Sequence, residues 1–213
     1  MTTPAWIALA VAAAAALADW FAVATDRRSL EYIAKPLTMA ALIVVAATVD
    51  AGDDARRAWF VAAGALSLVG DVFLMLPRDR FVPGLVAFLG AHVCYVVGLL
   101  QAPVDLTGII LGAVVVGLAL ASIGRRVLGA VRRGEHRALL GPVSAYMVVI
   151  SAMVLAAFAT GPWLAILGAG LFYASDSLIA ERRFVRASAW APVAIMVTYH
   201  LGQAGLMLSL TLA

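Results

Sequence analysis

Two aspartates, Asp71 and Asp176, lie inside long apolar segments of the chain, where an ionised side chain is costly unless it meets a partner or faces a cavity. Polar residues accompany both of them. Ser67 precedes Asp71 by one helical turn, and Tyr173 and Ser175 lie within one turn of Asp176. If the two carboxyl groups face each other, one can hold a proton while the other is ionised, which is the resting state of an acid/base pair.

The alternative for these two aspartates is purely structural. Each carboxylate could form its own ion pair with an arginine at the membrane boundary, such as Arg78 for Asp71 and Arg182 for Asp176. The aspartates would then stabilise the fold and take no part in chemistry. The sequence leaves both interpretations open.

A short set of further polar residues interrupts the apolar segments. Hydrogen bonds between membrane helices explain any single one of them, whereas their collective placement around one level favours a common polar site. His92 and Tyr95 are three residues apart, and Tyr199 and Gln203 are four apart, so each pair shares a helix face. The full set is Asp19, Lys35, His92, Tyr95, Tyr146, Tyr199, His200 and Gln203.

Several other chemistries lack their sequence signatures. The chain contains no GxSxG, HExxH or GxxxxGK[ST] motif, which disfavours a serine hydrolase, a zincin and a P-loop protein. The aspartates and histidines show no diagnostic ligand spacing, so we expect neither a metal nor a cofactor. Cys94 is the single cysteine, which excludes an internal disulfide. The basic residues lack interleaved aromatics, and nucleic acid is not an expected partner.

The composition predicts the elements that must position these residues. Of 213 residues, 64% are hydrophobic and 13% are charged, against about 25% charged in a soluble domain. Because a membrane-crossing helix needs roughly 20 mostly apolar residues, we predict an all-α fold of eight transmembrane helices in one integral membrane domain, 1–213. The runs are 4–25, 36–49, 58–76, 82–100, 104–123, 139–159, 162–179 and 190–212. The second run is short and should borrow residues 32–35, and the first lacks a preceding basic residue, which argues against a cleaved signal peptide.

The distribution of basic residues predicts the orientation in the membrane. Thirteen of the fifteen Lys and Arg residues fall in the odd-numbered loops, and Arg56 and Arg57 fall on the other side. By the positive-inside rule, the odd loops face the cytoplasm and both termini lie outside the plasma membrane. The thirteen are Arg27, Arg28, Lys35, Arg78, Arg80, Arg125, Arg126, Arg132, Arg133, Arg137, Arg182, Arg183 and Arg186.

A weak internal repeat relates the two halves of the chain, 1–103 and 104–213. Asp71 matches Asp176, and His92 matches His200, at offsets slightly above 100 residues. Four helices per half would make the halves parallel repeats about an axis along the membrane normal. Chance matching between helices rich in Ala and Leu is the alternative.

Four motifs together resemble a known family. They are Lys35-Pro36 in segment 35–39, Gly70-Asp71 in 65–76, the pattern of Gly84, Leu85, Phe88 and His92 in 81–95, and Ser175-Asp176-Ser177 with Ala180 in 168–180. Tyr146 and Met153 lie between the third and fourth of these segments, and Tyr199 and Gln203 follow the fourth. This combination resembles the YhhN-like membrane proteins, which include the lysoplasmalogenases, or alkenyl ether hydrolases.

The resemblance implies a membrane enzyme that cleaves the vinyl ether bond of a lysoplasmalogen, releasing a fatty aldehyde and a glycerophospho headgroup. Its partners would be this lysophospholipid substrate and the surrounding membrane lipids. Vinyl ether hydrolysis requires protonation at carbon and capture of the resulting cation by water, for which paired carboxyl groups are suited, as in glycoside hydrolysis. We hypothesise that Asp71 and Asp176 share these roles, with either as the acid. Lys35 would hold the phosphate, and the other residues expected to bind substrate or line the cavity are His92, Tyr95, Tyr146, Tyr173, Ser175, Tyr199 and Gln203.

Two other classes compete with an enzyme. A small proton-coupled transporter also uses intramembrane carboxylates and histidines, but its site usually involves helices broken near their centre. The prolines that could break a helix, Pro36, Pro83, Pro142 and Pro192, are all predicted at helix starts. A non-catalytic lipid-binding protein is the third class, and retention of both aspartates with Lys35 and Tyr146 weighs against it.

Overall fold

The computed structural model describes residues 1–78 and 80–212, and its regular structure within these ranges is entirely helical. The α-helices are α1 Thr3–Ala24, α2 Arg28–Thr48, α3 Asp54–Met75, α4 Phe81–Leu99, α5 Leu106–Ala119, α6 Arg125–Arg133, α7 Leu140–Thr160, α8 Trp163–Phe184 and α9 Ala191–Leu208. A π-helical segment, Leu120–Gly124, joins α5 to α6, and short 3-10 turns cover Arg137–Leu139 and Ser209–Leu212. Eight helical spans in the described chain are long and apolar enough to cross a membrane, which confirms the predicted fold class.

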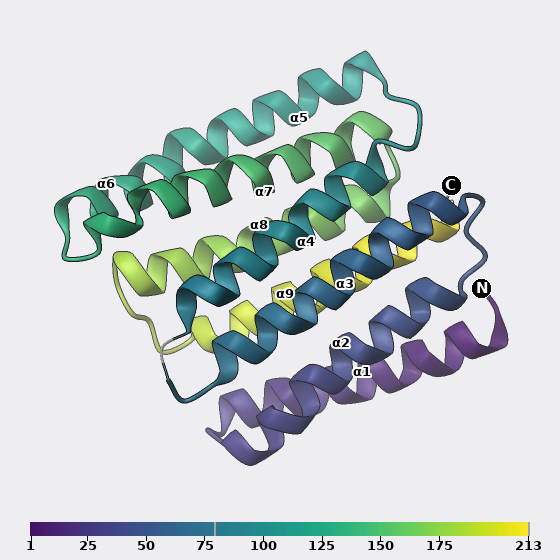
Figure 1. Cartoon of the computed structure of the whole chain (residues 1–213), viewed down its shortest axis with the longest axis horizontal. Helices are drawn as coiled ribbons and strands as arrows, with labels where there is room; N and C mark the ends of the chain where they lie inside the picture. The colour runs from purple at the N-terminus through teal and green to yellow at the C-terminus, as the bar shows by residue number, and fades with distance from the viewer. Residues whose placement is uncertain (79, 213) are drawn as a thin grey trace.

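The spans pack as antiparallel neighbours along the chain (Figure 1). α1 packs on α2, α3 on α4, α5 on α7, and α8 on α9. α9 also contacts α1 and α2 and is the most buried span, whereas α5 lies at the edge of the bundle and is almost wholly exposed. The exposed surface of α5 is apolar, as expected for a helix that faces lipid.

The second span differs from its prediction. α2 begins at Arg28 and runs unbroken to Thr48, so Pro36 lies inside the helix rather than at its start. Lys35 is correspondingly two turns into the helix rather than at its start, and it is buried, with 5% of its surface exposed. Pro36 removes one backbone donor and its ring crowds the carbonyl group one turn earlier, but the helix continues because packing against its neighbours outweighs that cost.

The other three prolines lie where they were predicted. Pro83, Pro142 and Pro192 fall in the first turns of α4, α7 and α9. A proline is tolerated there because the backbone N–H groups of the first turn have no partner within the helix. None of these prolines interrupts a span.

Glycines bring α8 and α9 into backbone contact. A Cβ atom on Gly168 would lie 2.5 Å from the backbone nitrogen of Leu206 and 2.8 Å from the carbonyl oxygen of Gly202. Gly202 and Gly205 face α8 with similarly short approaches to its backbone. Small residues at such a crossing allow membrane helices to pack closely, and this seam fixes the height of α9 side chains against α8.

We expect Gly168→Ala to lower the free energy of unfolding by about 2 kcal/mol, because its methyl group must push two backbones apart. Gly170→Ala is the matched control, since a Cβ atom there meets no other atom within 4 Å. Thermal unfolding of the two variants in detergent measures the difference. Equal stability of the two variants would contradict the close packing of this seam.

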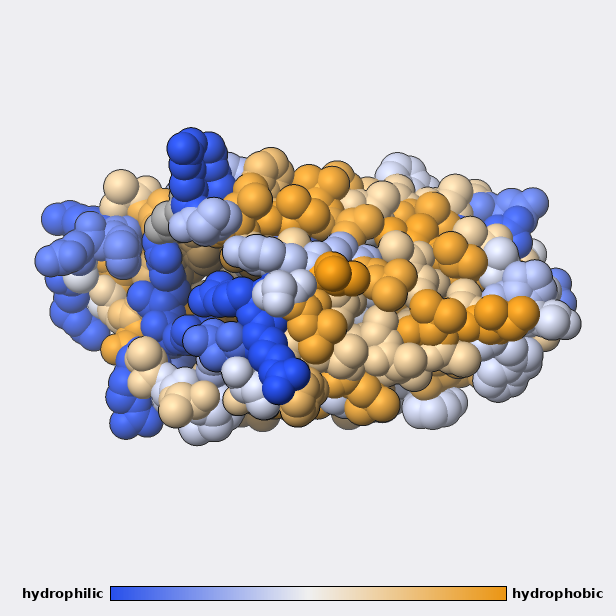
Figure 2. All heavy atoms as spheres, turned by 90° about the horizontal axis from the view of Figure 1, so that it is seen from below, coloured by the Kyte–Doolittle hydropathy of each residue, from blue (hydrophilic) through white to orange (hydrophobic). Residues whose placement is uncertain are grey.

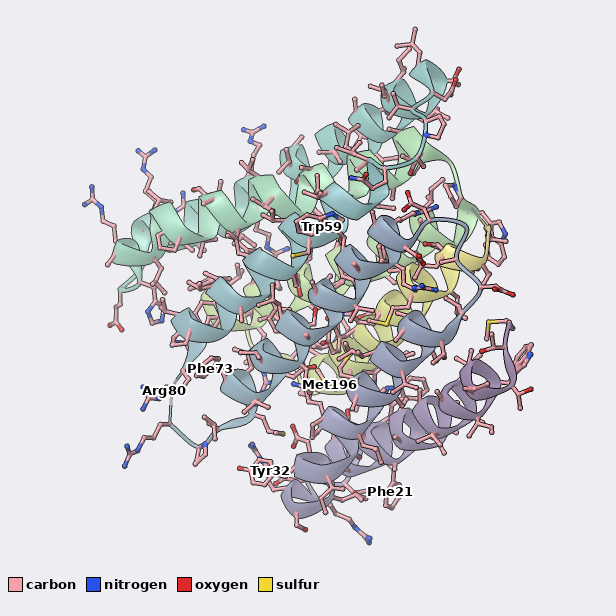
Figure 3. All side chains as sticks on the ribbon, turned by 45° about the vertical axis from the view of Figure 1, so that its right-hand side comes forward. Phe21, Tyr32, Trp59, Phe73, Arg80 and Met196 are labelled. Carbon is pink, nitrogen blue, oxygen red and sulfur yellow. The ribbon has the colours of Figure 1, made fainter. Side chains whose placement is uncertain are left out.

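Polar side chains gather at one end of the bundle. Figure 2 shows them surrounding a hollow at the end opposite the N-terminus of Figure 1. Figure 3 places Arg80, before α4, and Tyr32, near the start of α2, at this end. That this end faces the cytoplasm, with the termini outside, stays a prediction of the positive-inside rule.

Candidate active site

Asp71 forms a buried cluster with residues from two other helices. Its Oδ1 atom lies 3.2 Å from Nζ of Lys35 on α2, and its Oδ2 atom accepts a hydrogen bond of 2.6 Å from the hydroxyl of Tyr199 on α9. Asp71 and Lys35 are 1% and 5% exposed. A buried ion pair with an additional hydrogen bond satisfies most of the carboxylate, and the partner is Lys35 within the bundle rather than Arg78.

Asp176 forms a second cluster, also within the bundle. The hydroxyl of Tyr146 on α7 donates a hydrogen bond to its Oδ2 atom, and Nε2 of His92 on α4 lies 3.5 Å from the same oxygen. Nδ1 of His92 is 2.5 Å from the carbonyl oxygen of Phe88. Because a carbonyl can only accept, Nδ1 carries the proton, and in the neutral ring Nε2 presents its lone pair to Asp176. The partners of Asp176 are thus Tyr146 and His92 rather than Arg182.

Aromatic rings connect the two clusters. The Phe172 ring lies 4.7 Å from the His92 ring and 5.3 Å from the Tyr199 ring, measured between centroids. Phe88 packs edge-on against both Phe172 and Tyr199, at 6.0 and 5.8 Å. The aspartates therefore occupy neighbouring clusters, each with its own partners, on either side of a packed aromatic group.

Other residues predicted for the site tie helices together. The Tyr95 hydroxyl on α4 donates to Oε1 of Gln203 on α9 at 2.5 Å, and the Ser175 hydroxyl on α8 donates to the carbonyl of Ile195 on α9 at 3.1 Å. These are the interhelical hydrogen bonds that the sequence offered as an alternative. Tyr173 lines a hollow together with Asp176.

Asp19 and His200, which the sequence singles out as polar residues without assigning them a role, lie near the clusters, as do three aromatic residues to which it assigns no role in the site: Trp20, Phe88 and Phe172. Asp19 on α1 is fully buried, and neither carboxylate oxygen has a hydrogen-bond partner within the described chain. Trp20 donates from Nε1 to Nδ1 of His200 at 3.1 Å. Phe88 and Phe172 carry no signal beyond hydrophobicity, whereas Asp19 is detectable as a charge in an apolar helix.

Two hollows reach these clusters from different directions. An apolar crevice of about 70 Å³ lies among α4, α6, α7 and α8, and Asp176 and Tyr146 form part of its wall. A polar vestibule of about 700 Å³ opens at the basic end, where Figure 2 shows the hollow, and Lys35 lines it. Leu74, Phe81 and Ile179 line both hollows. A small apolar hollow thus adjoins space for a charged group.

The π-helical segment forms one wall of the crevice. Ile123 and Gly124 of this segment line the hollow, and Arg126 just beyond it pairs with Glu181 of α8 at 2.6 Å. Insertions of this kind in a helix often occur at functional positions. This segment connects the exposed helix α5 to α6, which lies at the basic end of the bundle.

This fold and site define a class: an eight-helix membrane protein that holds two carboxylates inside the bundle, Asp71 paired with a lysine that lines a polar vestibule and Asp176 in the wall of an apolar crevice. The family model "YhhN family" matches residues 30–210, and the chain belongs to the YhhN family, as the resemblance indicated. No solved structure matches the chain.

Curated relatives carry a common name. Proteins named lysoplasmalogenase from Mycobacterium bovis and Mycobacterium tuberculosis are each 37% identical to this chain over 168 residues, which is 75% of this chain and 62% of the relative. The human protein named lysoplasmalogenase TMEM86B is 34% identical over 151 residues, covering 68% of this chain and 61% of its own length. The chain thus spans less than two thirds of the length of these relatives.

Proposed function

We propose that this protein is a lysoplasmalogenase: a membrane hydrolase that cleaves the vinyl ether bond of a lysoplasmalogen to a fatty aldehyde and a glycerophospho headgroup. The observation that carries the proposal is the shared wall between the crevice at Asp176 and the vestibule at Lys35. A lysophospholipid has one apolar chain and one charged headgroup, which match these two environments. The names of the curated relatives support the same activity.

The proposed substrate lies across the wall of Leu74, Phe81 and Ile179. The part of its alkenyl chain next to the ether bond lies in the crevice, and its phosphate lies in the vestibule near Lys35 and the lining arginines Arg78, Arg80, Arg182 and Arg183. The ammonium group of Lys35 would lie between two anions. It already lies 3.2 Å from the Asp71 carboxylate, and it would contact the phosphate on its other side. The ether bond would then lie close to Asp176, with the vestibule facing the cytoplasm at the plasma membrane.

In the proposed mechanism Asp176 is the acid. It transfers a proton to the alkenyl carbon farther from the ether oxygen, and the carbon that bears the oxygen becomes an oxocarbenium ion. A water molecule adds to that carbon and returns a proton to Asp176. The hemiacetal then breaks its bond to the glycerol oxygen, which takes up the hydroxyl proton, and the aldehyde is released.

The partners of the two aspartates favour this division of roles. Asp176 contacts a phenol and an imidazole in an apolar wall, which suits a carboxylic acid that donates a proton. Asp71 is held by an ammonium group and a hydroxyl, which suits a permanent negative charge. Asp71 would stabilise the cation that develops on the substrate, as the second carboxylate does in glycoside hydrolysis.

Release of fatty aldehyde tests the function directly. Purified protein in detergent is incubated with an alkenyl lysophospholipid, the saturated alkyl ether and the acyl ester of the same headgroup. We expect aldehyde from the alkenyl lipid alone, because only the vinyl ether can be protonated to an oxocarbenium ion. Absence of aldehyde, or release of fatty acid from the ester, would overturn the proposal and make transport in proteoliposomes the next measurement.

Tyr146→Phe should lower turnover about tenfold, since it removes the hydrogen bond to Asp176 but keeps the ring that packs 5.2 Å from His92. The Michaelis constant should stay unchanged, because the hydroxyl orients the acid and does not hold the lipid. Steady-state kinetics on the alkenyl substrate measures both. Tyr32→Phe, at an exposed tyrosine, is the control, and full turnover in Tyr146→Phe would remove Tyr146 from the mechanism.

A further inference from the structure

Glu31 is an acidic side chain in a basic hollow. It lies in the first turn of α2, is half-buried, and lines the vestibule. The other charged residues that line the vestibule are all basic: Lys35, Arg78, Arg80, Arg182 and Arg183. Among residues 1–78 and 80–212, no cation lies within ion-pair distance of Glu31. Its carboxylate is thus available to a ligand in the hollow.

The spacing of Glu31 and Lys35 suits a ligand that carries both charges. They are four residues apart on one helix, so their side chains are neighbours on the same face. Lys35 and the arginines can bind a phosphate, and Glu31 can bind a cationic group that is covalently attached close to that phosphate. The headgroup of a zwitterionic phospholipid has this arrangement, because two carbon atoms separate the phosphate ester from the nitrogen.

The aromatic lining of the vestibule distinguishes two kinds of ammonium group. A quaternary ammonium has no N–H donor and is typically recognised by a cage of aromatic rings. The rings that line the described vestibule are Phe81 and His136. The Phe81 ring carries the guanidinium of Arg183 at 4.9 Å, and the His136 ring packs against Phe184 at 5.7 Å. These rings form no cage, whereas a primary ammonium can donate hydrogen bonds to a carboxylate.

We propose that Glu31 selects the headgroup, by receiving the primary ammonium of a phosphoethanolamine while Lys35 holds its phosphate. This inference rests on the proposed function and names the substrate class more closely: ethanolamine rather than choline lysoplasmalogens. Glu31 is a specificity-determining residue and takes no part in the bond-breaking steps.

Three alkenyl lysolipids test the proposal, with ethanolamine, choline, or no group on the phosphate. For the unmodified protein we expect kcat/KM to be highest with ethanolamine. Glu31→Gln should lower kcat/KM for ethanolamine about tenfold, the size expected for one charge-assisted hydrogen bond at a half-buried site, and leave the lipid without an amine unaffected. Glu31→Asp should recover part of the preference.

Asp26→Asn is the matched control, because it removes the same charge from an exposed residue at the same end of the bundle, where Asp26 pairs with Arg28 at 3.6 Å. It should leave all three substrates unchanged. Equal loss on all three lipids in Glu31→Gln would indicate a general electrostatic effect and overturn the proposal. Unchanged selectivity in Glu31→Gln would overturn it as well.

Binding of non-cleavable lipids separates this inference from the proposed function. Saturated alkyl ether lysolipids with ethanolamine or choline headgroups are titrated into the unmodified protein and Glu31→Gln. Tighter binding of the ethanolamine lipid, lost in Glu31→Gln, would support headgroup selection even if no vinyl ether were cleaved. Cleavage without any headgroup preference in binding or turnover would leave the proposed function standing and refute the role of Glu31.

Discussion

Asp176→Asn should lower turnover of an alkenyl lysophospholipid by about a thousandfold, within the range that general acid catalysis contributes. An amide is close to a carboxyl group in size, so the contacts with Tyr146 and His92 can be kept in altered form. The amide is far too weak an acid to donate a proton to the alkenyl carbon. Aldehyde release under single-turnover conditions measures the chemical step without contributions from product release.

Two controls make this result specific to the acid. Asp50→Asn makes the same change at an exposed residue outside the two clusters and should turn over normally. Asp71→Asn should also lose turnover, but for another reason: it removes the negative charge that would stabilise the developing cation, and it alters the pair with Lys35. If Asp176→Asn is folded and retains full turnover, Asp176 is not the acid, and the crevice has another role.

Lys35→Met should lower the free energy of unfolding by about 3 to 5 kcal/mol, because it leaves the Asp71 carboxylate buried without its cation. The hydrogen bond from Tyr199 alone does not replace the ammonium group. Methionine fills a similar volume, so the effect reports on charge rather than on a cavity. Denaturant or thermal unfolding in detergent gives the magnitude.

The double variant Lys35→Met/Asp71→Asn should recover much of that stability, since it removes both buried charges together. Arg57→Met is the control, because it also removes a cation from an ion pair, but the partner, Asp54, is exposed to solvent. It should change stability little. If Lys35→Met unfolds with the same free energy as the wild type, the buried ion pair is not a major contribution to stability. Failure of the double variant to recover would indicate that Lys35 stabilises the fold through other contacts.

The number of spans was predictable because length and apolar composition determine how many helices can cross a bilayer. The start of α2 was predictable only in part: the sequence indicated that the span would borrow residues 32–35, whereas residues 28–31 are polar enough to resemble a loop. In the structure some of these polar groups face the vestibule, as Glu31 does, or meet a buried partner, as Lys35 does. Hydropathy alone cannot distinguish a helix that lines a polar hollow from a loop in water.

The residues of the two clusters were predictable, but their pairing was not. A polar side chain in an apolar helix is visible in the sequence, which identifies Lys35, Asp71 and Tyr199 individually. Their contacts depend on how each helix is rotated and which helices are neighbours, and a single sequence does not contain that information. Phe88 and Phe172 were missed because phenylalanine is ordinary in a membrane helix, and only packing gives their rings a special position.

The internal repeat stays a prediction, and the contacts support it. Asp71 in the third span is bound by Lys35 of the second span and Tyr199 of the eighth. Asp176 in the seventh span is contacted by Tyr146 of the sixth and His92 of the fourth. Each aspartate thus meets the preceding span of its own half and the last span of the other half, as two related halves would require.

The wall that the two hollows share would give the two products of the proposed reaction different exits. Under the proposed function, a lysoplasmalogen would lie across Leu74, Phe81 and Ile179 before cleavage, since these residues line both hollows. Afterwards, the glycerophospho half lies on the side open to water, and the aldehyde lies among apolar helices. The aldehyde can then partition directly into the bilayer while the headgroup diffuses away, so neither product needs to pass through the position of the other.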